Sequence, residues 1–219
     1  MTRRARWEAW VRQGPHLYVI TDTGYAGKSH VEIVREALAG GAELIQMRDK
    51  TLPDKAFYEQ ALECARLCRE AGAWFFVNDR VHVALAVGAD GVHVGQDDLP
   101  PDVVRRLVGD DMLIGRSTHS PEEFRRAHWS EPVDYVAFGP IFATQTKPQS
   151  VPLGVPLLRD MMKEAVRPVV AIGGITLDRL PALVPTGVAM VAVVSDIMTG
   201  RIADRVAAYR TTLRSYRAS

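Results

Sequence analysis

Residues 30–50 read HVEIVREALAGGAELIQMRDK, and this stretch contains the repeating unit from which we predict the fold. Residues 30–40 place apolar groups at helical spacing and end in glycine, which fits a left-handed helix cap. Residues 43–48 then begin as an apolar run, typical of a parallel strand that is buried on both faces. The stretch therefore predicts a helix followed by a buried strand.

The end of this strand changes character. Residues two apart share a face of a strand, so Gln46, Arg48 and Lys50 lie on one side, and Met47 and Asp49 lie on the other. A buried strand that ends in three donors on one face either reaches the surface there or presents the donors to an anion. The rest of the chain decides between these interpretations.

The same unit recurs along the chain. Eight strand-like runs are separated by helical patterns, several of which end in glycine, and the runs cover residues 16–21, 43–48, 73–78, 91–95, 112–117, 134–139, 168–174 and 189–195. Strict alternation of strand and helix indicates an α/β protein with a parallel sheet and helical crossovers. Eight evenly spaced units favour a closed (β/α)₈ TIM barrel. The alternative is an open, doubly wound sheet.

We expect one domain over residues 1–219, because α/β barrels of about 200–250 residues are usually undivided. Residues 1–15 predict a short extra N-terminal helix that packs Trp7, Trp10 and Val11 on the body. Residues 16–198 form the barrel core, and residues 199–219 form a C-terminal helix.

The composition excludes several classes of function. Hydrophobic residues make up 47% of the 219 residues, and the formal net charge is +1, so a nucleic-acid or membrane partner has no electrostatic support. No apolar stretch approaches the roughly 18 residues that span a bilayer, and the N-terminus lacks the apolar region of a signal peptide. Cys64 and Cys68 are four residues apart in a helical pattern, where ordinary helix positions are favoured over a metal or redox pair. A cytoplasmic protein fits these observations.

Polar side chains follow seven of the strand-like runs. In a barrel, the carboxyl ends of the strands carry the chemistry. Exposure of a strand end to water explains any one of these polar residues. It explains poorly why seven consecutive strands end in polar residues, so we predict a ligand site. Its candidates are Gln46, Arg48, Lys50, Asn78, Asp79, Gln96, Asp97, Asp98, Ser117, Thr118, His119, Thr144, Thr146, Lys147, Gly173, Gly174, Val194, Ser195 and Asp196.

Two of the candidates suggest a cation. The third and fourth strands should be neighbours about 5 Å apart, so Asp79 and either Asp97 or Asp98 can approach one point. Two close carboxylates repel unless they share a proton or a cation. Magnesium takes one or two carboxylates together with waters and phosphate oxygens. The alternatives are a salt bridge from Asp79 to Arg80 and helix-capping roles for both carboxylates.

The charged candidates suggest that the magnesium would be shared with a phosphate. Arg48, Lys50 and Lys147 could hold the same phosphate from other sides. Gly173 and Gly174, followed by Ser195, suggest a second anion site, because backbone N–H groups after the seventh and eighth strands often bind a phosphate. The rim therefore fits two phosphorylated substrates or one bisphosphate.

Other features have less specific interpretations. GYAGKS at residues 24–29 resembles a phosphate-binding loop but has Asp22 where that motif needs glycine, so the match fails. His93 alternates with buried valines. A hydrogen-bonded core histidine explains it at least as well as a metal ligand or a general base does. His119 lies at the expected rim.

Several motifs, in this order between about residues 16 and 198, together resemble those of the thiamine-phosphate synthase family: QMRDK, VNDR, ALAVGADGVHVGQDDLP, IGRSTHS, DYVAFGPIFATQTKP, AIGGI and VAVVSDI. The resemblance implies a transferase that joins 4-amino-2-methyl-5-pyrimidinylmethyl diphosphate to a thiazole ethyl phosphate, releasing diphosphate. Magnesium would be the cofactor, held by Asp79 and Asp98.

The resemblance also assigns the substrate-binding residues. The pyrimidine diphosphate would be bound by Gln46, Met47, Arg48, Asp49, Lys50, Asn78, Ser117 and Lys147. The thiazole phosphate would be bound by Thr144, Gln145, Thr146, Gly174, Val194 and Ser195. Arg48, Lys50, Ser117 and Lys147 would be catalytic, stabilising the diphosphate as it leaves a pyrimidine carbocation. Met47, Asp49 and Gln145 are small departures from the family pattern.

Two rival functions remain at this point. One is a thiazole tautomerase, a related isomerase that would not need the full magnesium and diphosphate set. The other is a non-catalytic barrel that binds thiamine intermediates, for which loss of charge at the rim would be the sign. The partners would be small phosphorylated molecules, and exposed apolar helix faces point to a homodimer.

Overall fold

The computed structural model describes residues 1–145 and 150–217 and contains a closed barrel of eight parallel strands. Each strand pairs with the next in sequence, and the first pairs with the last. The strands are β1 (His16–Ile20), β2 (Leu44–Met47), β3 (Trp74–Asn78), β4 (Gly91–Val94), β5 (Leu113–Thr118), β6 (Tyr135–Phe138), β7 (Val169–Ile172) and β8 (Met190–Val193). The predicted TIM barrel is therefore confirmed, and the open sheet is excluded.

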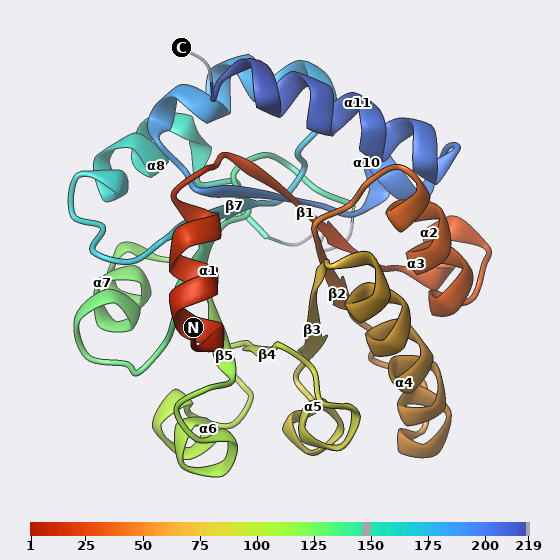
Figure 1. Ribbon diagram of the computed structural model, residues 1–219. Coiled ribbons are helices and arrows are strands. Elements are labelled where there is room, and N and C mark those ends of the chain that lie inside the picture. Colours follow the sequence, from red (N-terminus) through yellow and green to blue (C-terminus); the bar gives the residue numbers. More distant parts are fainter. Residues whose placement is uncertain (146–149, 218–219) are drawn as a thin grey trace.

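Helices surround the barrel, as the ring in Figure 1 shows. The longer α-helices are α1 (Arg3–Val11), α3 (His30–Ala39), α4 (Asp54–Ala71), α5 (Val81–Val87), α6 (Pro101–Val108), α7 (Pro121–Trp129), α8 (Gly154–Met162) and α11 (Ile202–Ser215). Short turns of helix are α2 (Thr23–Ala26), η1 (Leu177–Arg179), α9 (Leu180–Leu183), η2 (Val184–Thr186) and α10 (Ser195–Met198). None of the helices in residues 1–145 and 150–217 has the length and apolarity needed to cross a membrane.

Alternation along each strand divides the core into two layers. Phe75 and Val77 of β3 point outward into the layer between sheet and helices, whereas Phe76 points into the barrel. The same parity puts Ile45 and Met47 of β2 in the outer layer. Because parity is fixed by the pleat, Gln46 must point into the barrel.

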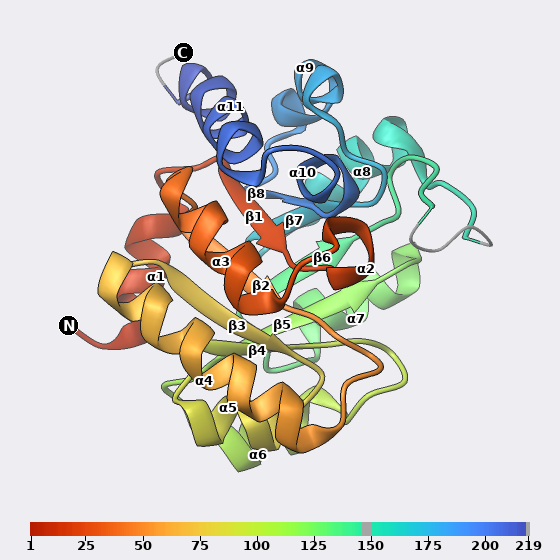
Figure 2. The same ribbon diagram turned by 90° about the vertical axis from the view of Figure 1, so that its right-hand side faces the viewer.

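Helix α1 closes the amino-terminal end of the barrel. Trp7 and Val11 are buried against the inward-facing residues of the strands, and the Trp7 ring centroid lies 5.6 Å from that of Phe76 and 5.8 Å from that of Tyr135. Trp10 stacks on His16 at 3.7 Å. Figure 2 shows α1 at one end of the strands and the loops that follow the strands at the other. The extra N-terminal helix was predicted correctly, and it covers the amino-terminal end of the barrel.

Glycine makes room for the large rings inside the barrel. A Cβ atom on Gly115 of β5 would lie 2.1 Å from Cζ of Tyr135 and 2.5 Å from Nδ1 of His93. A Cβ atom on Gly91 of β4 would lie 2.2 Å from the Phe76 ring. Since no real Cβ can approach that closely, these two glycines allow aromatic and imidazole rings to fill the interior.

Candidate active site

A cavity of about 290 Å³ lies at the carboxyl ends of the strands. Its wall includes many of the predicted site residues, namely Gln46, Arg48, Lys50, Asn78, Asp79, Asp98, Ser117, Thr144, Val194 and Ser195. These residues lie in or just after six different strands, so closure of the barrel brings them together. Apolar side chains form another part of the wall: Ile20, Ala137, Val170, Ile172, Ile175 and Ala192.

Asp79 and Asp98 form a carboxylate pair at one side of the cavity. Burial raises the pKa of Asp79, and the neighbouring Asp98 raises it further, although Lys50 acts in the opposite direction. Burial also acts to raise the pKa of Asp98, but hydrogen bonds from Asp79 and from the Gly95 N–H outweigh it and lower that pKa. Two carboxyl groups with opposite shifts share one proton, or bind a cation in its place.

The backbone at Asp79 is unusual, with a φ of 61°, whereas every other positive φ among the described residues belongs to glycine. The Asp79 N–H donates to the carbonyl of His93 at 2.8 Å, which ties the end of β3 to β4. Left-handed backbone is uncommon outside glycine and costs free energy, but Asp and Asn tolerate it best. This conformation turns the carboxylate toward Asp98 and Lys50 rather than along the strand.

The structure answers the alternatives for these carboxylates. Arg80 forms its ion pair with Asp54 at 2.8 Å, whereas Asp79 pairs with Lys50. Asp98 accepts the Gly95 N–H at 2.7 Å within its own loop, and α6 begins later, with Pro100 at its N-cap. Asp97 also lines the cavity, but the carboxylate that shifts the pKa of Asp79 is that of Asp98. Neither a bridge to Arg80 nor a helix cap therefore accounts for the pair.

The loop after β2 separates two sets of side chains. Arg48 and Lys50 line the cavity, and Lys50 contacts Asp79. Asp49 turns the other way: its Oδ1 accepts the N–H groups of Thr51 at 2.7 Å and Leu52 at 2.8 Å. Strand alternation predicted that Gln46, Arg48 and Lys50 share one face, and all three line the cavity. The alternation therefore continues past the end of β2 at Met47.

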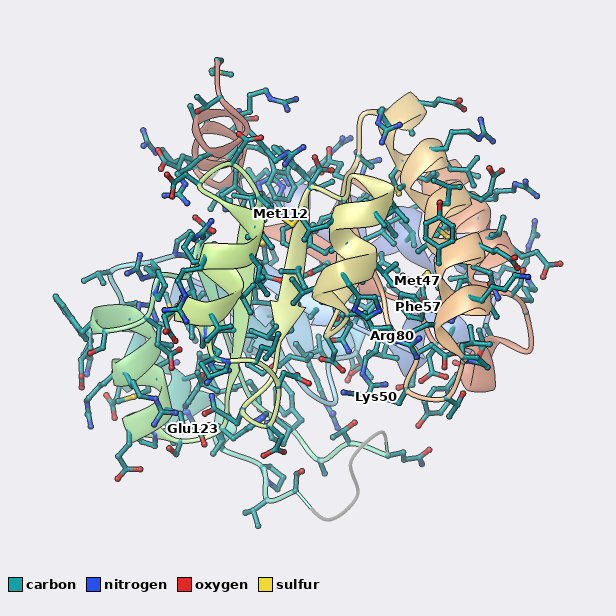
Figure 3. All side chains as sticks on the ribbon, turned by 90° about the horizontal axis from the view of Figure 1, so that it is seen from below. Met47, Lys50, Phe57, Arg80, Met112 and Glu123 are labelled. Atoms are coloured by element: carbon teal, nitrogen blue, oxygen red, sulfur yellow. The ribbon has the colours of Figure 1, made fainter. Side chains whose placement is uncertain are left out.

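Figure 3 shows Lys50 at the end of the molecule opposite α1, near Arg80. Met47 is fully buried in the outer core layer, and neither it nor Asp49 lines the cavity. Direct substrate contacts by Met47 and Asp49 stay a prediction that this geometry does not favour. Arg80 supports the loop from outside, donating to the carbonyls of Asp49 at 3.4 Å and Leu52 at 2.5 Å.

A chain of buried polar groups forms the floor of the cavity. Gln46 Nε2 donates to the Tyr18 hydroxyl at 2.8 Å, and the hydroxyls of Tyr18 and Tyr135 lie 2.8 Å apart. Nδ1 of His93 lies 2.8 Å from the Tyr135 hydroxyl, and its Nε2 lies 2.7 Å from Oγ of Ser117. Burial raises the pKa of both tyrosines, so both stay protonated.

This chain changes the interpretation of His93. It is a hydrogen-bonded core histidine, as the simpler interpretation expected, and it also lines the cavity. Sequence reasoning missed Tyr18 and Tyr135. The available signal for Tyr18 was its parity, because it lies two residues before Ile20 on the inward face of β1.

His119 lies on the cavity wall, with Nδ1 2.7 Å from the carbonyl oxygen of Gly139. Because a carbonyl oxygen only accepts, Nδ1 must carry the proton, and Nε2 of the neutral ring is left as an acceptor. His119 therefore holds the loop after β6 in place.

The loops after β6 and β7 pack closely because both contain glycine. A Cβ atom on Gly173 would lie 2.4 Å from Cα of Pro140, and one on Gly174 would lie 2.3 Å from the carbonyl oxygen of Ala143. Gly173 lines the cavity, whereas Gly174 and the exposed Gln145 do not. Thr146 and Lys147, both predicted site residues, lie outside the described residues.

The short helix α10 completes this side of the cavity. It begins at Ser195, which lines the cavity together with Val194. Asp196 fixes the helix to α11, because its carboxylate pairs with Arg205 and accepts the Tyr209 hydroxyl. The first N–H groups of a helix have no partner within it, so they can face a phosphate.

Within residues 1–145 and 150–217, no group of three or more His, Cys, Asp or Glu side chains could hold a metal ion. Asp79 and Asp98 are a pair, which suits magnesium when a substrate phosphate supplies further oxygens. Cys64 and Cys68 are buried in α4, away from the cavity.

Comparisons with known proteins agree with this geometry. A family model described as thiamine monophosphate synthase matches residues 17–197. Among curated proteins, the chain is 46% identical over 182 residues to a thiamine-phosphate synthase of Persephonella marina, covering 83% of this chain and 87% of that one. It is 45% identical over 184 residues to the enzyme of Pelotomaculum thermopropionicum, covering 83% and 84%. A solved thiamine phosphate pyrophosphorylase from Pyrococcus furiosus superposes with a TM-score of 0.86 at 38% identity, covering 95% of this chain and 99% of that one.

Proposed function

The chain belongs to the thiamine monophosphate synthase family, and on this premise we propose that it joins a pyrimidinylmethyl diphosphate to a thiazole ethyl phosphate, giving thiamine phosphate and diphosphate. It is a transferase of thiamine biosynthesis that acts on small phosphorylated substrates. The observation that carries the detailed proposal is the division of one cavity into a charged side, beside β2, β3 and β4, and a side of glycine and helix N–H groups, beside β7 and β8.

The charged side suits the diphosphate. Arg48 and Lys50 would neutralise its oxygens, and Asn78 and Ser117 would donate hydrogen bonds from the same wall. Lys147 would add a further positive charge. A diphosphate becomes more negative as its bond to the pyrimidine methylene carbon breaks, so these groups stabilise the transition state more than the ground state.

Magnesium fits the carboxylate pair. Asp79 and Asp98 are close enough to perturb each other's ionisation, so a bound cation would be favoured over two unneutralised charges. The ion would supply further positive charge to the leaving diphosphate. Lys50, which pairs with Asp79, is half exposed and can move to phosphate oxygens when substrate arrives.

The floor and the apolar wall suit the two rings. The pyrimidine carries an amino group and ring nitrogens, which the Gln46 amide and the polar chain beneath it can recognise. Ile20, Ile172 and Ala192 offer flat apolar contact to a ring above the floor. Such contacts would hold the methylene carbon in line with the thiazole nitrogen.

The thiazole phosphate would lie on the opposite side of the cavity. Val194 and Ser195 would present N–H groups at the start of α10, and Thr144 would present its hydroxyl from the loop after β6. Gly174 would act through the close packing of its loop, since it does not line the wall. Gln145 and Thr146 complete the predicted set.

The reaction needs no protein nucleophile. Diphosphate departs with the electron pair of the carbon–oxygen bond, the ring amino group stabilises the resulting methylene cation, and the lone pair of the thiazole nitrogen then forms the new carbon–nitrogen bond. Water would compete for that cation, so an apolar wall on a one-ended cavity protects the reaction. The family assignment supports this synthesis over a tautomerase or a binding-only barrel.

We also propose a cytoplasmic location and, from the exposed Tyr58, Leu62 and Leu85 on neighbouring helices α4 and α5, a homodimer as the oligomeric state to test. No nucleic acid or membrane is proposed as a partner.

A direct assay tests the function. Purified protein, magnesium, the pyrimidine diphosphate and the thiazole phosphate are mixed, and thiamine phosphate and diphosphate are followed together. Equal appearance of both products, abolished by a chelator and restored by added magnesium, is expected. A changed thiazole tautomer without either product would instead identify an isomerase.

A further inference from the structure

His30 is a fully buried histidine that does not line the cavity, yet its side chain connects directly to the loop that does. It is the first residue of α3, next to the capping box formed by Ser29 and Glu32. Its Nδ1 lies 2.8 Å from Oγ1 of Thr21, and its Nε2 lies 3.0 Å from Oδ2 of Asp49. His30 therefore bridges the end of β1 and the loop after β2.

The direction of each hydrogen bond follows from the acceptors. Hydrogen bonds from Leu52, Thr51 and His30, acting against burial, hold the pKa of Asp49 well below its usual range. A carboxylate only accepts, so Nε2 of His30 must donate. Burial lowers the pKa of His30, which favours the neutral ring, and Nδ1 then accepts the Thr21 hydroxyl.

Thr21 links His30 back to the loop after β2 by a second hydrogen bond. Its Oγ1 accepts the backbone N–H of Arg48 at 3.2 Å while its hydroxyl hydrogen goes to His30. The bonds thus run from the Arg48 N–H through Thr21 and His30 to the Asp49 carboxylate. Two consecutive residues of the loop are connected through one buried imidazole.

The arrangement fixes the residues on either side of Asp49. Arg48 is held by its own N–H, and Lys50 lies between Asp49 and Thr51, which are joined by two hydrogen bonds of 2.7 and 2.9 Å. Long flexible side chains lose affinity when their backbone is free to shift, and a misplacement of about 1 Å can cost on the order of 100-fold in rate. The buried imidazole removes that freedom.

We propose that His30 is a positioning residue for the diphosphate-binding loop: through Thr21 and Asp49 it holds the backbone that aims Arg48 and Lys50 into the cavity. This assigns Asp49 to the support of the loop and makes direct contact with substrate unnecessary for its role. The inference rests on the proposed function for its substrate, and on the described contacts for its mechanism.

The test compares His30→Leu, which removes both hydrogen bonds, with His30→Gln, which keeps a donor for Asp49. The matched control is His128→Leu, because His128 is also buried and does not line the cavity, and its ring also forms hydrogen bonds, in this case with the backbone N–H groups of Val166 and Arg167. Thr21→Val removes the hydrogen bonds of Thr21 with His30 and with the Arg48 N–H, and it is the second variant in case His30→Leu does not fold. Thermal unfolding establishes that each variant is folded before its kinetics are compared.

Two measurements distinguish positioning from simple core packing. The first is the KM of each substrate, for which we expect His30→Leu to raise that of the pyrimidine diphosphate about 10-fold or more and that of the thiazole phosphate less than about 2-fold. The second is calorimetric binding of inorganic diphosphate with magnesium, which should weaken similarly. His30→Gln should recover part of both losses, and His128→Leu should leave the ratio of the two KM values unchanged.

A double-mutant cycle adds an internal check. If His30 acts through Asp49, the loss in His30→Leu/Asp49→Asn should be smaller than the product of the two single losses.

Failure of the inference can be told apart from failure of the function. If wild-type protein makes thiamine phosphate and His30→Leu changes both KM values equally or not at all, the positioning role is wrong. If wild-type protein makes no product, the proposed function is wrong, and the inference is then tested by the binding of inorganic diphosphate alone. Equal affinity in His30→Leu and wild type overturns the inference, and an affinity at least about 10-fold weaker in His30→Leu supports it.

Discussion

Replacement of Asp79 by asparagine separates the chemical role of this residue from its backbone role. Its φ of 61° lies in the left-handed region, which asparagine adopts about as readily as aspartate does. Asp79→Asn therefore keeps the size and backbone of the site and removes one negative charge. Asp79→Ala removes the same charge but also brings a side chain that disfavours this backbone.

In Asp79→Asn we expect activity to fall but stability to be kept. Loss of one of two carboxylates should reduce kcat/KM by at least about 100-fold, equivalent to roughly 2.7 kcal/mol of transition-state stabilisation. Stability without magnesium should not fall in Asp79→Asn, because the amide no longer repels Asp98 and the half-exposed Lys50 is readily hydrated. Asp79→Ala should be about 1 kcal/mol less stable than Asp79→Asn, a difference of about 2–4 °C in Tm.

The assay titrates magnesium against product formation for wild type and both variants, with thermal unfolding in the presence of a chelator. A right-shifted magnesium curve with reduced maximal turnover is expected for both variants. Near-normal kcat/KM and an unchanged magnesium requirement in Asp79→Asn would refute the carboxylate pair as the metal site. Equal Tm values for the two variants would refute the backbone argument alone.

Three further predictions follow from other parts of the molecule. Ser195→Asp places a negative charge at the start of α10 and should raise the KM of the thiazole phosphate about 10-fold, with little change for the pyrimidine diphosphate in the same steady-state assay. Gly115→Ala brings a Cβ within 2.1 Å of the Tyr135 ring, so denaturant unfolding should reveal a loss of about 1–3 kcal/mol, and an unchanged stability would contradict the packing of the floor. Burial lowers the pKa of His128 from 6.5 to about 4, so the unfolded chain binds a proton more readily than the folded one. Stability should consequently fall as the pH decreases from about 6.5 to 4, and His128→Gln should flatten that part of the profile.

The sequence by itself determined the fold and the outline of the site. Apolar runs such as residues 73–78, most of them continuous, indicate burial on both faces of a parallel sheet, and eight evenly spaced runs between helices favour a closed barrel over an open sheet. In a closed barrel, the polar residues at the ends of seven of these runs then meet at one rim. Strand parity alone also placed Gln46, Arg48 and Lys50 on the cavity side, away from Met47 and Asp49.

The tertiary structure decided which of these residues act together, because side-chain pairing depends on the register of strands that are far apart in sequence. Parity could not reveal that Tyr18 and Tyr135, 117 residues apart, meet on the barrel floor. Local sequence left Arg80 as an alternative partner of Asp79, but in the structure Asp79, with its left-handed backbone, pairs with Lys50, and Arg80 pairs with Asp54. Nor could spacing connect His30 with Asp49, since that contact exists only because α3 packs its first turn against the end of β1.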